Sequence, residues 1–321
     1  MKQIVVLDGK TLGNVDFSKL NEFGNVTYYD LTSSNEVEER IKNANIVLTN
    51  KVVLNENNLK NAKNLELICE MATGFNNIDV NYAKENNIAV TNVAGYSTNT
   101  VAQHTFAMAL NLYDKIAYFD NYVKSKEYSR SNVFTNVDEV YKDINGKVWG
   151  IVGLGAIGKR VAKIAEAFGC EVVYYSTSGK NSNSEYRRVD FKELLEISDI
   201  ISIHAPLNEN TKGLMNYEAF KGMKNDSILI NMGRGPIVVD ADLAKAIDEN
   251  LIGGAGLDVF EIEPMQENNP LLSIKNKEKL VLSPHIAWAS EEARNRLFND
   301  LLENIRVYNK GEIKNRVLIY V

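Results

Sequence analysis

Apolar and polar positions along the chain follow two alternating patterns. Short apolar runs rich in β-branched residues, typical of buried strands, alternate with longer stretches in which apolar residues recur every three or four positions, as in amphipathic helices. This order predicts βαβ units and therefore parallel sheets. A first set of strands is expected at Gln3–Leu7, Val26–Tyr29, Ile46–Leu48, Leu65–Cys69 and Ile88–Thr91. A second set is expected at Val148–Val152, Glu171–Tyr175, Ile200–Ile203, Ser227–Asn231, Gly254–Leu257 and Leu280–Ser283, so the pattern indicates two sheets of five or six strands.

The pattern breaks near residue 99, where a long helical segment begins. This segment runs from Thr100 to about Lys126, after the possible capping residues Ser97 and Asn99. A C-terminal helix over residues 291–309 has one apolar face that needs a surface to bury against, and we expect it to return to the first set of strands. We therefore predict two doubly wound α/β domains with a cleft and a hinge between them, one of residues 1–99 with 291–321 and one of residues 100–290.

Composition narrows the class of protein. The chain has 321 residues, 45% of them hydrophobic and 24% charged, which suits a globular protein of about two domains. The net charge of −6 and the lack of a long basic run argue against a nucleic-acid partner. No apolar run reaches the length of a signal peptide or of a membrane span, so we expect a cytoplasmic protein without a membrane partner. Cys69 and Cys170 are isolated, which predicts core residues and no metal site.

A glycine-rich turn points to a dinucleotide. Gly153-Leu154-Gly155-Ala156-Ile157-Gly158 follows an apolar strand and precedes a helix expected over Lys159–Phe168. In this setting Gly153 permits the tight turn, Gly155 lets the backbone approach a pyrophosphate, and Gly158 lets the helix meet the strand. The helix N-terminus then faces the negative charge of the phosphates. The turn, with Ala156 and Ile157, predicts binding of NAD or NADP.

The residue that usually selects NAD is missing. Where an acidic residue would bind the adenosine ribose, the chain has Ser176, followed by Thr177, Ser178 and Lys180. Hydroxyl groups and a lysine do not repel a 2′-phosphate, so NADP is admissible. A solvated loop that tolerates NAD explains the same residues equally well, and the preference stays open.

Polar and small residues follow the later strands of the second set. Because ligands of open parallel sheets bind beyond the carboxyl ends of the strands, these residues are candidates for cofactor contacts. They are His204, Ala205, Pro206, Met232, Gly233, Arg234 and Asp258, with Glu261, Glu263, Pro284 and His285 beyond them.

Carbonyl reduction by a hydride needs a proton donor, and the chain has three histidines. His285 is the best acid candidate, with Glu263 as a carboxylate that can orient the ring and favour its charged form. Arg234 can offer a planar fork to a carboxylate or polarise a ketone. His204 suits a plain cofactor contact, and His104 is expected to be a packed or surface residue. Taken singly, each candidate has an equal claim to a structural role.

Five segments together resemble the D-isomer-specific 2-hydroxyacid dehydrogenases over nearly the whole chain. They are residues 73–79 (TGFNNID), the turn at Gly153, residues 231–238 around Arg234, residues 258–264 (DVFEIEP) and residues 283–286 (SPHI). The chain is most similar to the glycerate dehydrogenase and hydroxypyruvate reductase branch of that family. The resemblance implies NAD(P)-dependent reduction of a small 2-keto acid, with hydroxypyruvate or glyoxylate giving D-glycerate or glycolate. It also implies that Arg234, Glu263 and His285 form the catalytic set.

The resemblance implies further contacts. Backbone amides around Thr73 and Gly74 would bind the substrate carboxylate, next to Arg234 and His285, and Thr100 would contact the cofactor. A homodimer would form through the cofactor domain, including the long helix and an arm from about Ile116 to Asn145. Many NAD-using members have aspartate at the position of Ser176, which leaves the cofactor open. Formate dehydrogenases pair their histidine with glutamine, so Glu263 argues against that branch.

Two other functions remain open. One is a dehydrogenase for bulkier 2-keto acids, in which Trp288, Lys51 and Asn50 would line the substrate side, although each has an equal claim to packing or surface duty. The other is a dinucleotide-sensing binding protein, as in the transcriptional corepressors of the family. The presence of all three catalytic candidates favours an enzyme.

Overall fold

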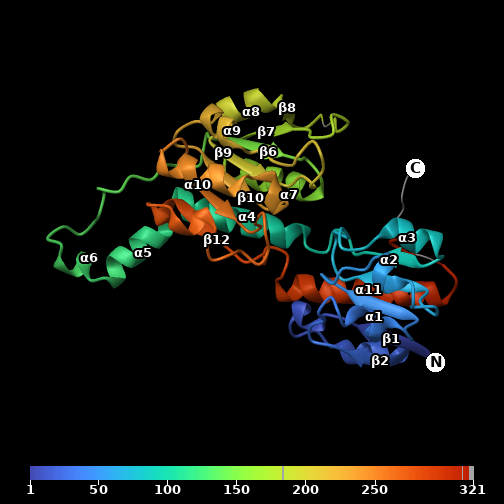
Figure 1. The fold of residues 1–321 in the computed structure, drawn as a ribbon. Helices are drawn as coiled ribbons and strands as arrows, with labels where there is room; N and C mark the ends of the chain where they lie inside the picture. The colour runs from blue at the N-terminus through green and yellow to red at the C-terminus, as the bar shows by residue number, and fades with distance from the viewer. Residues whose placement is uncertain (183, 313, 318–321) are drawn as a thin grey trace. The chain divides into compact units, whose positions relative to one another are not determined.

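The computed structural model describes residues 1–182, 184–312 and 314–317, and the chain divides into two compact units. The first unit comprises Met1–Ser97 and Ala289–Val321, and the second comprises Thr98–Trp288. Figure 1 shows the ribbon of both units. Each unit contains one parallel sheet with helices, which confirms the predicted α/β class.

The sheet of the first unit has five parallel strands in the order β2-β1-β3-β4-β5. They are β1 (Lys2–Val6), β2 (Gly24–Tyr28), β3 (Ile46–Thr49), β4 (Leu67–Glu70) and β5 (Ala89–Thr91). All five predicted strands are present, and no end is shifted by more than two residues. The strand order reverses between β1 and β3, as in flavodoxin-like sheets, and this switch point is where such sheets bind ligands.

Short helices and one long helix complete the first unit. They are the 3-10 helices η1 (Gly9–Leu12) and η2 (Phe17–Glu22) and the α-helices α1 (Val37–Ile41), α2 (Glu56–Leu59), α3 (Val80–Glu85) and α11 (Glu291–Asn309). The apolar face of α11 is buried, and the helix contacts β4. Arg296 Nε donates to the Tyr96 carbonyl at 2.9 Å, and Asn304 Nδ2 donates to the Asn92 carbonyl at 3.2 Å. These bonds join the helix to the end of the N-terminal segment.

The sheet of the second unit has seven parallel strands in the order β12-β11-β10-β9-β6-β7-β8. They are β6 (Val148–Val152), β7 (Glu171–Tyr175), β8 (Arg187–Arg188), β9 (Ile200–Ile203), β10 (Ile228–Asn231), β11 (Gly254–Leu257) and β12 (Leu280–Leu282). Six of them match the predicted set. The expectation of at most six strands was wrong because β8 consists of two exposed arginines and carries no apolar signal.

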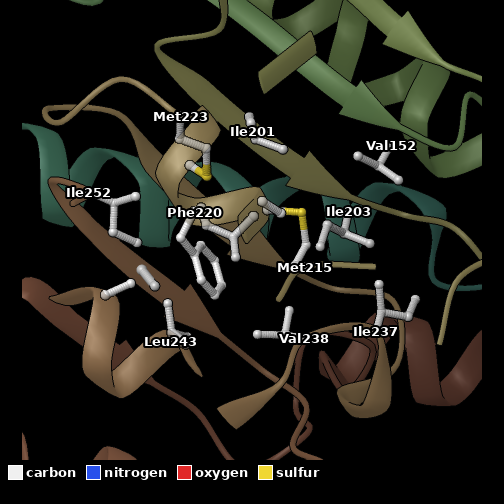
Figure 2. Packing of buried hydrophobic residues seen from close by; sticks show 14 of the residues in the cluster. Val152, Ile201, Ile203, Met215, Phe220, Met223, Ile237, Val238, Leu243 and Ile252 are labelled. Carbon is white, nitrogen blue, oxygen red and sulfur yellow. The ribbon is translucent and has the colours of Figure 1, made fainter. Parts of the chain in front are cut away.

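Both faces of this sheet are buried. Alternate residues of the strands point to opposite faces, so Ile201 and Ile203 enter one core cluster while Ile200 enters the other. The first cluster also holds Phe220, Leu243 and other side chains from the covering helices, shown in Figure 2. Burial on both faces explains why these strands are continuous apolar runs.

The helices of the second unit differ from the prediction in two places. They are α4 (Thr98–Tyr113), α5 (Ile116–Lys124), α6 (Glu127–Arg130), α7 (Ala156–Ala167), α8 (Phe191–Ile197), α9 (Tyr217–Gly222) and α10 (Asp240–Asp248), with 3-10 helices η3 (Gly235–Ile237), η4 (Pro270–Ser273) and η5 (Lys277–Lys279). The helix expected from Thr100 to Lys126 is two helices, because Lys115 adopts a left-handed conformation (φ 52°) that ends the first. The helix after the glycine-rich turn begins at Ala156, three residues before the expected Lys159.

An arm leaves the second unit after α4. Figure 1 shows α5, α6 and the following segment extending away from the sheet of this unit. The arm carries exposed apolar side chains, namely Ile116, Val123, Tyr128, Val133, Phe134, Val137, Val140 and Tyr141.

Both cysteines are free and buried, as predicted for core residues. Burial raises the pKa of the Cys69 thiol to about 12 and that of Cys170 to about 11, so neither is a reactive thiolate near neutral pH. In the described part of the chain, the helices are all too short or too polar to cross a membrane. The same residues contain no cluster of histidine, cysteine and carboxylate side chains that would hold a metal ion.

Candidate active site

The predicted site residues of the second unit lie at one edge of its sheet. All seven strands are parallel, so their carboxyl ends meet at the same edge. The strand order reverses between β6 and β9, and the glycine-rich turn follows β6 at this switch point. The turn therefore lies where a doubly wound sheet binds its ligand.

The three glycines have the geometry that a dinucleotide turn requires. Gly153 has φ 93°, and a Cβ there would lie 2.9 Å from the backbone of Ala205. Gly155 has no atom within 4 Å of the position of a Cβ, so its backbone is open to a ligand. A Cβ on Gly158 would lie 2.4 Å from the carbonyl oxygen of Gly153, so the absence of a side chain lets the helix pack closely against the turn after β6. The tight turn at Gly153 and the close approach at Gly158 are present as predicted, and the approach of a pyrophosphate to Gly155 stays a prediction.

His204 presents an unsatisfied donor beside this turn. Trp149 Nε1 donates to Ser202 Oγ at 2.9 Å, and Ser202 Oγ lies 3.0 Å from His204 Nε2. The Ser202 hydroxyl can therefore donate to Nε2, which leaves the proton on Nδ1. That buried Nδ1 has no partner among the described residues, and burial lowers the pKa of His204 to about 3. A neutral histidine with a free N–H, next to an open phosphate turn, fits a bound dinucleotide.

The loop after β7 is built on Ser176. This side chain is only 5% exposed, and its Oγ accepts from the Asn181 amide at 3.3 Å. Ser178 and Lys180 are exposed, and Arg188 Nη1 from β8 donates to the Gly179 carbonyl at 3.0 Å. Ser176 thus shapes the loop, while Ser178 and Lys180 are exposed to solvent, and their contact with an adenosine ribose stays a prediction.

His285 and Glu263 are in contact, as predicted. His285 Nδ1 lies 2.8 Å from Glu263 Oε2, and Glu263 Oε1 accepts from the Phe260 amide at 3.1 Å. A carboxylate has no proton to donate, so Nδ1 carries the hydrogen and Nε2 is left for a ligand. The His285 side chain is 25% exposed, which gives a ligand access to the ring.

Arg234 is held beside the segment that carries Glu263. The buried Asn231 donates from Nδ2 to the Arg234 carbonyl at 3.1 Å and accepts from the Gly233 amide at 3.0 Å. A Cβ on Gly235 would overlap the Phe260 carbonyl at 1.7 Å, so only glycine lets the two backbones approach. The Arg234 guanidinium donates to the Gly233 carbonyl at 2.9 Å. The ends of β10 and β11 thus place Arg234 and Glu263 on adjoining segments.

Asp258 has a structural role that the sequence analysis did not assign. Its carboxylate is 2% exposed and accepts from the amides of Ile286 and Ala287 at 2.8 and 2.9 Å. Its Oδ1 also accepts from Ser283 Oγ at 2.5 Å, and Ser283 Oγ lies 2.9 Å from His104 Nε2. His104, expected to be merely packed or exposed, therefore has a specific polar partner.

In the first unit, the Thr73–Gly74 turn follows β4. Thr73 is exposed, its Oγ1 donates to the Val93 carbonyl at 2.9 Å, and its own carbonyl accepts from Asn92 Nδ2 at 2.7 Å. These bonds fix the turn, and its role in binding a carboxylate stays a prediction.

The three residues considered for substrate selection have structural partners. Asn50 is buried and donates from Nδ2 to Thr11 Oγ1 at 3.0 Å, and the Lys51 amide donates to Asp8 at 2.7 Å. Trp288 packs against the second core cluster of its unit.

Comparisons with known proteins agree with this geometry. The family model "D-isomer specific 2-hydroxyacid dehydrogenase, NAD binding domain" matches residues 106–287. The chain is 36% identical to a hydroxypyruvate reductase of Blautia hydrogenotrophica, over 98% of this chain and 99% of the relative. It superposes with a TM-score of 0.87 and 29% identity on a solved acyclic imino acid reductase in complex with NADPH and D-Arg, over 98% of this chain and 100% of that one. The D-lactate dehydrogenase of Aquifex aeolicus, complexed with NAD and lactic acid, gives a TM-score of 0.86 and 26% identity over 99% and 100% of the two chains.

Proposed function

Because the chain belongs to the D-isomer-specific 2-hydroxyacid dehydrogenase family, we propose that it reduces a small 2-keto acid to the D-2-hydroxy acid, with hydroxypyruvate and glyoxylate as the first candidates. The chain is an NAD(P)-dependent oxidoreductase acting on CH–OH groups. The observation that carries the proposal is the 2.8 Å contact between His285 Nδ1 and Glu263 Oε2. This contact orients the ring of His285, and it supports the proposal that His285 is the acid-base residue.

A dinucleotide bound at the glycine-rich turn would supply the hydride for the ketone carbon, and the chain's own residues would handle the proton and the substrate. Glu263 holds the Nδ1 proton of His285 and stabilises the charged ring, so Nε2 gives its proton to the ketone oxygen. Arg234 binds the carboxylate or polarises the ketone through its planar guanidinium. The Thr73 and Gly74 amides are the further groups that we predict to bind the substrate carboxylate. In the oxidation direction, His285 Nε2 takes the proton back.

We propose cofactor contacts for residues at the carboxyl ends of the strands of the second unit. The open backbone at Gly155 and the start of α7 would bind the pyrophosphate, since a helix N-terminus carries positive partial charge. The other proposed contacts are Thr100, Ala156, Ile157, Thr177, Ser178, Lys180, His204, Ala205, Pro206, Met232, Gly233, Arg234, Asp258 and His285. The lack of an acid at Ser176 supports use of NADPH as well as NADH.

We also propose a homodimer and a cytoplasmic location. Residues 116–141 expose several large apolar side chains on an arm, which is the composition of a surface that a second copy would cover. Size-exclusion chromatography with light scattering tests this proposal, and a monomer at micromolar concentration would contradict it.

The function is tested by replacing the proposed acid. His285→Gln is expected to lower kcat for hydroxypyruvate about 1000-fold, since general acid catalysis contributes on the order of 100- to 10,000-fold. Binding of NADPH and NADH, measured by fluorescence titration, is expected to change little. Glu263→Gln is a second variant, which removes the charge and one of the two acceptor oxygens but can still accept from His285 Nδ1, and its loss is expected to be smaller. Near-normal turnover of His285→Gln would overturn the assignment.

Substrate choice is tested separately. Purified protein is mixed with a panel of 2-keto acids from glyoxylate to bulky members, with each cofactor, and cofactor absorbance is followed. Faster reduction of a bulky member than of hydroxypyruvate and glyoxylate would overturn the small-substrate proposal. No reduction of any member would overturn the enzymatic proposal itself.

A further inference from the structure

One face of α4 packs in register against β11. A Cβ on Gly254 would lie 3.4 Å from Leu112 Cδ2, and a Cβ on Gly256 would lie 3.0 Å from Met108 Cβ. Met108 and Leu112 are four residues apart on the helix, and Gly254 and Gly256 are two apart on the strand, so each pair lies on one face. The two glycines let the helix lie close to the strand.

The next pair in this register is polar. One helical turn before Met108 is His104, and two residues after Gly256 is Asp258. His104 Nε2 lies 3.8 Å from Asp258 Oδ1, and Ser283 Oγ contacts both of these atoms, at 2.9 and 2.5 Å. The packing that buries the apolar pairs therefore also brings the histidine to the carboxylate.

The direction of the hydrogen bonds follows from a count of protons. Ser283 has one hydroxyl proton, and it is donated to Asp258, which as a carboxylate can only accept. The contact between Ser283 Oγ and His104 Nε2 then requires that Nε2 carry the hydrogen and donate it. A chain of two donors thus runs from His104 through Ser283 to the buried Asp258.

Asp258 in turn holds the backbone around His285. Its carbonyl accepts from the His285 amide at 2.8 Å, and its carboxylate accepts from the amides of Ile286 and Ala287. His285 has φ 54°, a left-handed conformation that is unfavourable for a residue other than glycine. The three bonds to Asp258 keep His285 in this conformation, which sets the direction in which its ring leaves the backbone.

We propose that His104 is a positioning residue for His285. Its Nε2–H, acting through Ser283, fixes the carboxylate of Asp258, and that carboxylate fixes the loop of residues 285–287. The ring of His285 can then reach Glu263 and keep Nε2 free. The inference rests on the proposed function, in which His285 is the acid, and it adds a residue more than one contact away from the reacting atoms.

The kinetic test compares three variants of α4. His104→Leu keeps the bulk and removes the donor, and we expect kcat to fall 10- to 30-fold with little change in KM for the keto acid. His104→Gln keeps an N–H at a similar reach, and we expect it to restore kcat to within about threefold of the unchanged protein. Gln103→Leu is the matched control, because it makes the same kind of change on the exposed face of the helix.

The structural test does not depend on turnover. The chain contains His104, His204 and His285 as its only histidines, so protein labelled with ¹⁵N-histidine gives signals from three imidazole rings, two nitrogens each, which are assigned from the single variants. We expect the signals of His285 to shift or broaden in His104→Leu and in Ser283→Ala, and to stay unchanged in Gln103→Leu. The double variant of His104→Leu and Ser283→Ala is expected to shift the His285 signals no more than the stronger single variant does, because both residues act through the same series of hydrogen bonds.

Two results would overturn the inference. The first is a His104→Leu variant whose His285 signals and kcat match those of the unchanged protein. The second is an equal fall in kcat for His104→Leu and His104→Gln together with equal losses of thermal stability, which would indicate a packing role. If the unchanged protein reduces no keto acid, the proposed function fails, while the spectra still decide whether His104 positions His285.

Discussion

Both units bury an acidic side chain at the carboxyl end of their parallel sheet, but the two side chains differ in how many hydrogen-bond donors surround them. Asp258, just beyond β11, accepts from one hydroxyl and two backbone amides. Glu70, the last residue of β4, is fully buried, and its Oε2 accepts from Asn77 Nδ2 at 3.1 Å. The Oε1 of Glu70 has no partner among the described residues.

The difference changes the charge of the first unit. Burial raises the pKa of Glu70 to about 9, with a further contribution from the nearby Asp8, so Glu70 is protonated at neutral pH. Asp8 accepts from the amides of Asn50 and Lys51, yet burial still raises its pKa. At the corresponding end of each sheet, the buried acidic residue thus behaves according to its donors. Asp258 is surrounded by donors and anchors a loop, whereas Glu70 is not surrounded by them and keeps its proton.

The largest expected change in the free energy of unfolding is a loss at Asp258, whose carboxylate has donors for both oxygens. Asp258→Asn replaces one acceptor by an NH₂ group, so either the Ala287 amide or the Ser283 and Ile286 donors face another donor. A buried group left unsatisfied costs about 1–3 kcal/mol, and we expect a loss of about 3 kcal/mol in the free energy of unfolding. Trp149 and Trp288 both belong to the second unit, so tryptophan fluorescence during urea unfolding reports on this unit.

Ser283→Ala provides a graded comparison for Asp258→Asn. It removes one donor and leaves both backbone amides bound, so a loss of about 1 kcal/mol is expected. Equal stability of Asp258→Asn and the unchanged protein would show that Asp258 does not anchor the loop.

A smaller change in the free energy of unfolding is expected at Glu70, where the substitution Glu70→Gln should stabilise the protein. The pKa of this acid is raised on folding, so the folded chain keeps a proton that the unfolded chain releases between about pH 4.5 and about pH 9. Stability therefore falls as pH rises through this window and levels off above it. Glu70→Gln cannot ionise, so its advantage over the unchanged protein should grow with pH and reach about 2 kcal/mol near pH 8, once relaxation around the ionised group is allowed for.

Far-UV circular dichroism during urea unfolding at pH 5 and pH 8 measures this difference. Glu85→Gln, at an exposed position of α3, is the matched control and should show no such growth. A constant difference between Glu70→Gln and the unchanged protein across the two pH values would contradict a protonated Glu70.

The parts of the fold that the sequence predicted are those that depend on apolar runs. The strands β3, β4, β9 and β10 are fully buried and largely apolar, so their positions were visible, as was the burial of α11. The two-residue strand β8 was missed because Arg187 and Arg188 are exposed and polar. The break at Lys115 was missed because a lysine in a left-handed conformation has no local signal, unlike the glycine at Gly153.

In the site, too, some contacts could be predicted from the sequence and others could not. The contact between His285 and Glu263 was predictable because both residues follow strands of one parallel sheet. The link from His104 to Asp258 was not, because it depends on which helix covers β11 and in which register. The spacing of Gly254, Gly256 and Asp258 does indicate that a helix could pack closely on this side of β11. Which helix packs there cannot be read from the sequence, and only the folded structure identifies it as α4.

The smallest expected effect concerns two matched helix caps, one in each unit. Asp79 Oδ1 accepts from the Tyr82 amide at 3.0 Å at the start of α3, and Asp190 Oδ1 accepts from the Glu193 amide at 2.8 Å at the start of α8. Replacing either aspartate by alanine should cost about 1 kcal/mol, since each removes one cap. Circular dichroism follows Asp79→Ala, and tryptophan fluorescence follows Asp190→Ala in the second unit. Asp79 ends the segment of residues 73–79, one of the five that resemble the family, so an equal loss in the two variants assigns this aspartate to helix stability. Weaker binding of the keto acid by Asp79→Ala, without loss of stability, would instead place it among the groups that bind substrate.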